Sequence, residues 1–162
     1  MIGKTFTKLA LLGVGFFYSV AAKPALPIPT SGTYRIQNAD TGLYIDAFES
    51  LQDPGTPVIV FPLNEPATAN QQWTVILFDP PFGELQSISS FVTFTGTSGN
   101  LVATLDPSAA NVITFSSTPG GVSLCGQPTS VGCLTSPSTG DTQIPLLPFT
   151  GALNQTWIFQ PV

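Results

Sequence analysis

The sequence contains no histidine, and only four of its 162 residues are lysine or arginine. The lack of histidine excludes a histidine general base, a Ser-His or Cys-His nucleophile pair and a histidine-liganded metal. The scarcity of basic residues argues against a nucleic-acid-binding surface and against attraction to anionic membranes. Charged residues make up only 8% of the chain, so Ser, Thr, Asn and Gln supply its polarity, which suits neutral polar ligands.

Long apolar segments are also scarce, with one exception near the start. Residues 9–20 form an apolar run that follows two lysines and precedes the small residues Ala21 and Ala22. This order predicts a secretory signal peptide over residues 1–22 and therefore a secreted, extracellular protein. The run is too short for a membrane span, and no later segment is long enough. Cleavage would leave two basic residues against nine acidic ones.

The two cysteines, Cys125 and Cys133, flank a turn-rich segment. In a secreted chain such a pair indicates a disulfide, here one that would staple a hairpin. A pair of free buried thiols is the alternative.

A short pattern occurs twice, as Asn70-Gln-Gln-Trp73 and as Asn154-Gln-Thr-Trp157. The two tryptophans lie 84 positions apart, which is twice 42, and Phe115 lies halfway between them in an apolar run. A period of about 42 residues repeated three times indicates a repeat architecture. It predicts one domain over residues 31–162, preceded by a Pro-rich extended arm at residues 23–30.

Proline and glycine recur throughout, and short alternating apolar runs between them are typical of many short strands. About twelve strands in three-fold recurrence predict a closed all-β structure, because closure removes exposed strand edges. The Pro-rich segment 79–83 is expected to link the first and second repeats, and residues 116–121 the second and third. The expected strands are 33–37, 43–47, 58–61, 73–78, 85–94, 101–105, 112–115, 122–125, 133–135, 144–147 and 157–159.

The first repeat resembles a known family. It opens with Gly32-Thr-Tyr-Arg-Ile-Gln-Asn, continues through Leu43-Tyr-Ile-Asp46 and ends at Gln-Gln-Trp73, which is similar to one repeat of a ricin-B-type lectin, in particular a fungal secreted member. The resemblance is closest over residues 31–78, weaker at the C-terminus and weakest in the middle. It implies a β-trefoil, built from three repeats with Gln-x-Trp-type motifs.

The resemblance also implies a sugar site in the first repeat. Asp46 matches the carboxylate that accepts hydrogen bonds from sugar hydroxyls, Phe61 the aromatic ring that stacks on the pyranose, and Asn70 the amide that binds a further hydroxyl. These groups suit a sugar, since carboxylates and amides bind hydroxyls and a flat ring covers the C–H face. Ile59 departs from the family pattern, because a glutamine often stands at that position.

The motif residues Gln71, Trp73, Phe115, Gln155 and Trp157 are expected to be structural. The aromatic side chains should pack in the core, and the glutamines should satisfy buried backbone groups.

The other two repeats are expected to carry vestigial sites. In the third, Thr135 and Leu147 stand near the Asp and aromatic positions, although Asn154 is kept. In the second, Val112 and Ile113 replace Asn and Gln. Asn154 also begins a glycosylation sequon, whose use is left open because the motif is expected to be half-buried.

The leading hypothesis is a non-enzymatic, secreted carbohydrate-binding protein without metal or cofactor, whose partners are glycans or glycoproteins. A hydrolase pair of Asp46 with Glu49 or Asp53 is imaginable, but nothing in the sequence fixes its separation. One alternative is a β-trefoil protease inhibitor acting on a protein target through loop 64–69 or loop 79–83, which contain proline and lack lysine and arginine. Another is an effector that has lost sugar binding.

Overall fold

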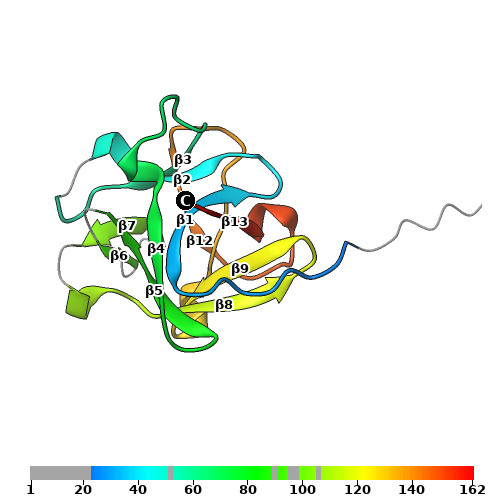
Figure 1. The fold of residues 1–162 in the computed structure, drawn as a ribbon. Helices are drawn as coiled ribbons and strands as arrows, with labels where there is room; N and C mark the ends of the chain where they lie inside the picture. Colours follow the sequence, from blue (N-terminus) through cyan, green and yellow to red (C-terminus); the bar gives the residue numbers. More distant parts are fainter. Residues whose placement is uncertain (1–22, 51–52, 89–90, 95–98, 105–106) are drawn as a thin grey trace, which may run out of the picture.

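The chain folds into short strands joined by turns and single-turn 3-10 helices in the computed structural model, which describes residues 23–50, 53–88, 91–94, 99–104 and 107–162 (Figure 1). The expected signal peptide, residues 1–22, lies outside the described residues. The strands are β1 (Gly32–Asn38), β2 (Tyr44–Ala47), β3 (Val58–Phe61), β4 (Trp73–Asp79), β5 (Phe82–Ser87), β6 (Phe91–Phe94), β7 (Leu101–Thr104), β8 (Ile113–Thr118), β9 (Gly121–Gly126), β10 (Cys133–Leu134), β11 (Thr142–Gln143), β12 (Leu146–Leu147) and β13 (Trp157–Pro161).

Six of the strands close into an antiparallel barrel. The ring runs from β1 to β4, β5, β8, β9 and β13, and it returns to β1 through five cross-strand residue pairs between β13 and β1. The expected closed all-β architecture is therefore confirmed. Each repeat contributes two barrel strands, and the first repeat contributes β1 and β4.

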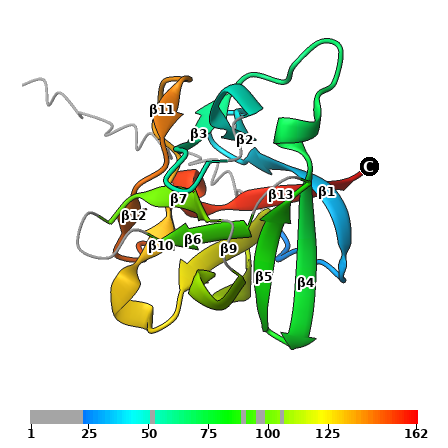
Figure 2. The same ribbon diagram turned by 90° about the vertical axis from the view of Figure 1, so that its left-hand side faces the viewer.

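The remaining strands form shorter pairs at one end of the barrel. They are β2 with β3, β6 with β7, and β10 with β12. Figure 2 shows the long β4–β5 hairpin on the right and the short strands β6, β7, β10 and β12 on the left. Strand β11 belongs to the third repeat in sequence, but it pairs with β3 of the first. This pairing brings the third repeat next to the β2–β3 hairpin.

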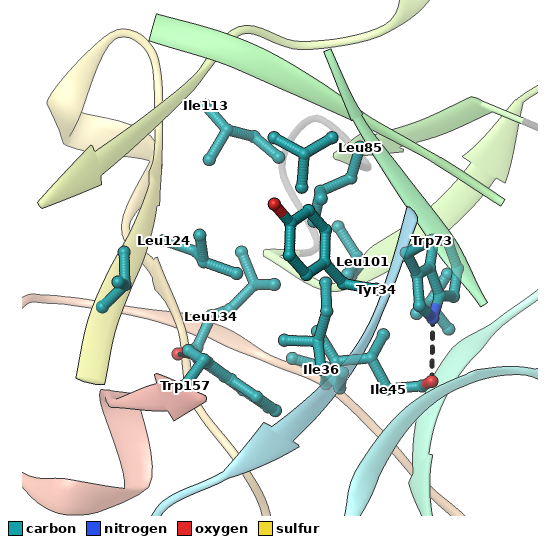
Figure 3. Packing of buried hydrophobic residues seen from close by; sticks show 14 of the residues in the cluster. Tyr34, Ile36, Ile45, Trp73, Leu85, Leu101, Ile113, Leu124, Leu134 and Trp157 are labelled. Atoms are coloured by element: carbon teal, nitrogen blue, oxygen red, sulfur yellow. Dashed lines mark hydrogen bonds between the residues drawn. The ribbon is translucent and has the colours of Figure 1, made fainter. Parts of the chain in front are cut away.

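The core fills the barrel with side chains from all three repeats (Figure 3). Trp73, Phe115 and Trp157 are fully buried, at 0% exposure. The indole N–H of Trp73 donates to the carbonyl oxygen of Ile45 at 2.8 Å, and that of Trp157 to the carbonyl of Leu134 at 3.2 Å. The second repeat has Ile113 at the position of the two tryptophans, because Ile113 pairs with Gly126 as Trp73 pairs with Ser87 and as Trp157 pairs with Asn38. Phe115 is buried as expected, but it lies two residues further along its strand, at the position of Val75 and Phe159, so its place in the Gln-x-Trp pattern is wrong.

The two expected links join the repeats where predicted, but each is a tight hairpin turn whose flanking residues belong to strands. Segment 79–83 lies at the turn between β4 and β5, so the prolines stand at the tip while the strands continue on both sides. The segment 116–121 is occupied by the end of β8 and the start of β9. The expected strand 85–94 is in fact the end of β5 and all of β6. Proline at the turn does not interrupt a ladder, which explains the difference.

The predicted disulfide joins Cys125 and Cys133, which face each other across β9 and β10.

The arm at residues 23–30 runs along the barrel, where the backbone N–H of Leu26 donates to the carbonyl of Thr118 at 3.3 Å. None of the helices in the described ranges is long and apolar enough to cross a membrane.

Candidate functional site

A surface hollow of about 330 Å³ lies beside the β2–β3 hairpin and contains the three residues predicted for the site. Asp46 comes from β2, Phe61 from the end of β3, and Asn70 from the 3-10 helix η2 (Ala69–Gln71) that precedes the Gln-x-Trp motif. The structure therefore brings together residues that are up to 24 positions apart in the sequence. Ile59, the departure from the family pattern, also lines the hollow.

Asp46 is buried and held by amide donors. Asn70 Nδ2 donates to Asp46 Oδ1 at 2.7 Å, and Gln71 Nε2 donates to Asp46 Oδ2 at 2.9 Å. Burial raises the pKa of Asp46 from 3.8 to about 6, because the charged form loses its hydration. The hydrogen bonds from Gln71, Asn70 and Asn64 oppose this rise in pKa, and the negative charge of Asp141 adds to it.

The orientation of the Asn70 amide is determined by its neighbours. Its Nδ2 donates to two acceptors, the Asp46 carboxylate and the Ala47 carbonyl, the latter at 3.3 Å. A flipped amide would place its oxygen against these two acceptors, so only one orientation is compatible with them. The Asn70 Oδ1 atom is consequently left buried without a hydrogen-bond partner. A buried polar atom of this kind is uncommon and calls for a ligand or water.

The hollow is also lined by four residues that the sequence did not indicate as sugar-site residues. They are Phe48, Glu49, Asn64 and Asp141. The sequence points to Glu49 only as half of a hydrolase pair, and Asp53, the other candidate, is not among the lining residues. Glu49 and Asp141 have left-handed backbone conformations, with φ of 52° and 57°. Such strain in a non-glycine residue concentrates at functional sites.

Asp141 reaches the hollow from another repeat. It precedes β11, and its backbone N–H donates to the Val60 carbonyl at 2.8 Å. The spacing of motifs within one repeat does not predict that Asp141 lies at the hollow, because the β3–β11 pairing joins different repeats. In the described ranges, no three His, Cys, Asp or Glu side chains gather closely enough to hold a metal ion.

The third repeat reproduces the scaffold without the polar site. Gln155 Nε2 donates to Thr135 Oγ1 at 3.0 Å and to the Pro148 carbonyl at 2.9 Å, as Gln71 Nε2 donates to Asp46 and to the Pro62 carbonyl at 2.8 Å. These matching bonds make Thr135 equivalent to Asp46. Both glutamines are buried and satisfy backbone groups.

The aromatic position of the third repeat follows from strand register. Cys133 pairs with Leu147 as Tyr44 pairs with Phe61, so Leu147 stands where the first repeat has Phe61. The third repeat thus has a hydroxyl and an aliphatic side chain in place of the carboxylate and the ring.

The second repeat follows the same register with different chemistry. Phe91 pairs with Thr104 as Tyr44 pairs with Phe61. Thr104 therefore stands at the aromatic position. The expectation that Val112 and Ile113 replace Asn70 and Gln71 is wrong, because Ile113 stands at the position of Trp73. Ala110 and Asn111 precede it where the first repeat has Asn70 and Gln71. The amide pair that holds Asp46 has no counterpart there.

No protein-family model and no curated protein matches the sequence. Solved structures do match it in fold. The Rhizoctonia solani agglutinin is 20% identical with a TM-score of 0.73, and the match covers 85% of this chain and 100% of that one. The Macrolepiota procera ricin B-like lectin, solved in complex with lactose, is 22% identical with a TM-score of 0.68, over 85% of this chain and 100% of that one.

The chain has the β-trefoil fold of ricin-B-type lectins. A proteinase inhibitor from Coprinopsis cinerea shares this trefoil, with 18% identity, a TM-score of 0.66 and coverage of 83% of this chain and 99% of that one. At these identities the likeness establishes the trefoil and not the activity, since one fold supports unrelated functions. The residues of the hollow therefore bear on the function more directly than the fold does.

Proposed function

We propose that this trefoil is a secreted carbohydrate-binding protein, a ricin-B-like lectin with one sugar site in its first repeat. The site consists of Asp46, Phe61 and Asn70. It binds its ligand without chemical conversion and needs no metal or cofactor. Its natural partners are glycans or the glycan chains of glycoproteins.

The unsatisfied Oδ1 of Asn70 carries this proposal. It is a buried acceptor of a residue that lines the hollow, and a sugar hydroxyl that reaches it can donate to it. Leaving a buried acceptor without a partner costs roughly 1–3 kcal/mol, which a bound hydroxyl would recover. Asp46 offers the lone pairs that its amide donors leave free, as an acceptor for a second hydroxyl.

Phe61 supplies the apolar part of the site. Its side chain is partly exposed on the edge of the hollow, where a ring can cover the C–H face of a pyranose. A second hollow of about 200 Å³ adjoins the first and shares Phe48, Ile59 and Asp141 with it. The two together favour a glycan of more than one sugar unit, because a single shallow subsite binds only weakly.

A glycan array with matched variants tests the proposal. Phe61→Ala and Asn70→Ala should abolish binding to the glycans that the unmodified protein retains. Leu147→Ala and Asn154→Ala change the equivalent positions of the third repeat and should leave binding intact. Circular dichroism checks that all four variants fold. If the folded protein binds no glycan on the array, the proposed site is wrong. It is also wrong if the third-repeat variants lose as much binding as the first-repeat variants do.

A protease inhibitor is the second candidate, favoured by the trefoil shared with the Coprinopsis cinerea inhibitor. Its contact loops would be 64–69 and 79–83, in which Glu65, Pro66 and Asp79 are exposed. Neither loop contains Lys or Arg, so a trypsin-like target is not expected. Inhibition assays with proteases of other specificities test this candidate, and Asp79→Ala should weaken inhibition if the second loop is used.

A further inference from the structure

The side chains that line the hollow offer hydrogen-bond acceptors, while their amide donors are already engaged. Asn70 Nδ2 donates to Asp46 and Ala47, and Asn64 Nδ2 donates to Thr68 Oγ1 at 2.7 Å. Gln71 Nε2 likewise donates to the Asp46 carboxylate and to the Pro62 carbonyl. The Oδ1 of Asn70 is a buried acceptor without a partner. A ligand group that donates fits these side chains better than one that accepts.

All the ionisable side chains that line the hollow are acidic. Three carboxylates line it, those of Asp46, Glu49 and Asp141. Glu49 and Asp141 are exposed, and Asp141 lies near enough for its charge to act on Asp46. No basic side chain is among the lining residues.

The basic residues of the described chain lie elsewhere. Lys23 lies in the N-terminal arm beside Gly120, and Arg35 lies in β1 opposite Gln160. The negative potential of the hollow is therefore open to a cation from the ligand.

We propose that the hollow selects glycans that carry a free ammonium group, such as a hexosamine that is not N-acetylated. An ammonium has three N–H donors, no acceptor and a positive charge, which complements both the acceptors and the carboxylates. An acetamido group brings a carbonyl that finds no free side-chain donor, and a uronic acid brings a repelled charge. Phe48 and Phe61 add aromatic surface, which also attracts cations. This inference rests on the proposed sugar site and names its ligand class.

Titration calorimetry with matched sugars tests the inference. Glucosamine, galactosamine and mannosamine are each compared with the N-acetylated sugar, the parent hexose and, for the first two, the uronic acid. At about pH 7 and low salt, at least one amino sugar should bind about fivefold or more tightly than its N-acetylated and neutral counterparts, as expected for a few partly exposed charge pairs. Added salt should reduce this preference.

Variants at the exposed carboxylates locate the effect. Glu49→Gln and Asp141→Asn should each reduce the preference for the amino sugar while leaving the affinity for the parent hexose nearly unchanged. Asp79→Asn removes the same charge from the exposed end of β4, outside the hollow, and should change neither. If the control variant has the same effect, net charge rather than the hollow explains the preference, and the inference is wrong.

The outcomes separate this inference from the proposed function. If neutral or N-acetylated sugars bind at Asn70 and Phe61 as tightly as amino sugars do, the ammonium preference is refuted and the sugar site stands. If no sugar or larger glycan binds the folded protein, both are refuted. If Nα-acetyl-lysine methylamide binds as tightly as the best amino sugar, the hollow recognises a cationic peptide and the glycan assignment fails.

Discussion

Raising the pH from about 4 to about 7 should weaken the fold through one buried carboxyl group, that of Asp46. Its pKa in the folded protein is about 6, against an ordinary value of 3.8, and burial is the main cause. The folded state therefore keeps a proton that the unfolded chain releases within this interval. The stabilisation is present in full below pH 3.8 and is lost as the pH rises through about 6. Its size is roughly 3 kcal/mol.

Urea denaturation of the unmodified protein and of Asp46→Asn, at a series of pH values, measures this contribution. The amide that replaces the carboxyl group does not titrate, so the difference in unfolding free energy between the two proteins should change by about 2–3 kcal/mol from pH 4 to pH 7, in favour of the variant. The constant cost of altered hydrogen bonds cancels in this comparison. Asp79→Asn, at an exposed position, is the control and should show little such change. A difference that stays constant with pH, or that changes in the opposite direction, would refute the desolvation argument.

Two further predictions concern the scaffold. Trp157→Phe should lower the unfolding free energy by about 1–3 kcal/mol, because the buried Leu134 carbonyl loses its indole donor; an unchanged urea midpoint would mean that water replaces this bond. Replacing Cys125 and Cys133 by serine should lower the unfolding free energy by about 2–3 kcal/mol, because the unfolded chain loses the constraint of the disulfide. Thermal unfolding with and without a reductant measures this effect. The reductant should destabilise the unmodified protein and leave the variant unchanged. A variant as stable as the oxidised protein would assign the disulfide no role in stability.

The sequence predicts much of this fold because the repeat marks its core. Trp73, Phe115 and Trp157 recur at a fixed spacing and all three are buried, although strand register places Ile113 rather than Phe115 at the position of the two tryptophans. Closure of the barrel follows from the same recurrence. The Pro-rich segment 79–83 joins the first and second repeats as predicted, but its prolines do not indicate that this join is a tight hairpin turn with a strand on each side.

The site is predicted less completely, for physical reasons that differ between residues. Asp46, Phe61 and Asn70 belong to one repeat, so their spacing carries the signal, and the structure places them along one hollow. Their role in binding stays a prediction. Asp141 comes from the third repeat through the β3–β11 pairing, which local patterns do not encode. Glu49 turns toward the hollow from a left-handed conformation, which glutamate does not favour by itself.

The pairing of β1 with β13 also has a consequence for biosynthesis. The first barrel strand to leave the ribosome acquires its neighbour β4 early, but its other edge waits for the last strand. Until β13 emerges, the nascent chain holds an incomplete barrel with unpaired edges, which invite association with other chains. A premature stop codon before Trp157 would make this state permanent, so such a product should be a target for cellular quality control.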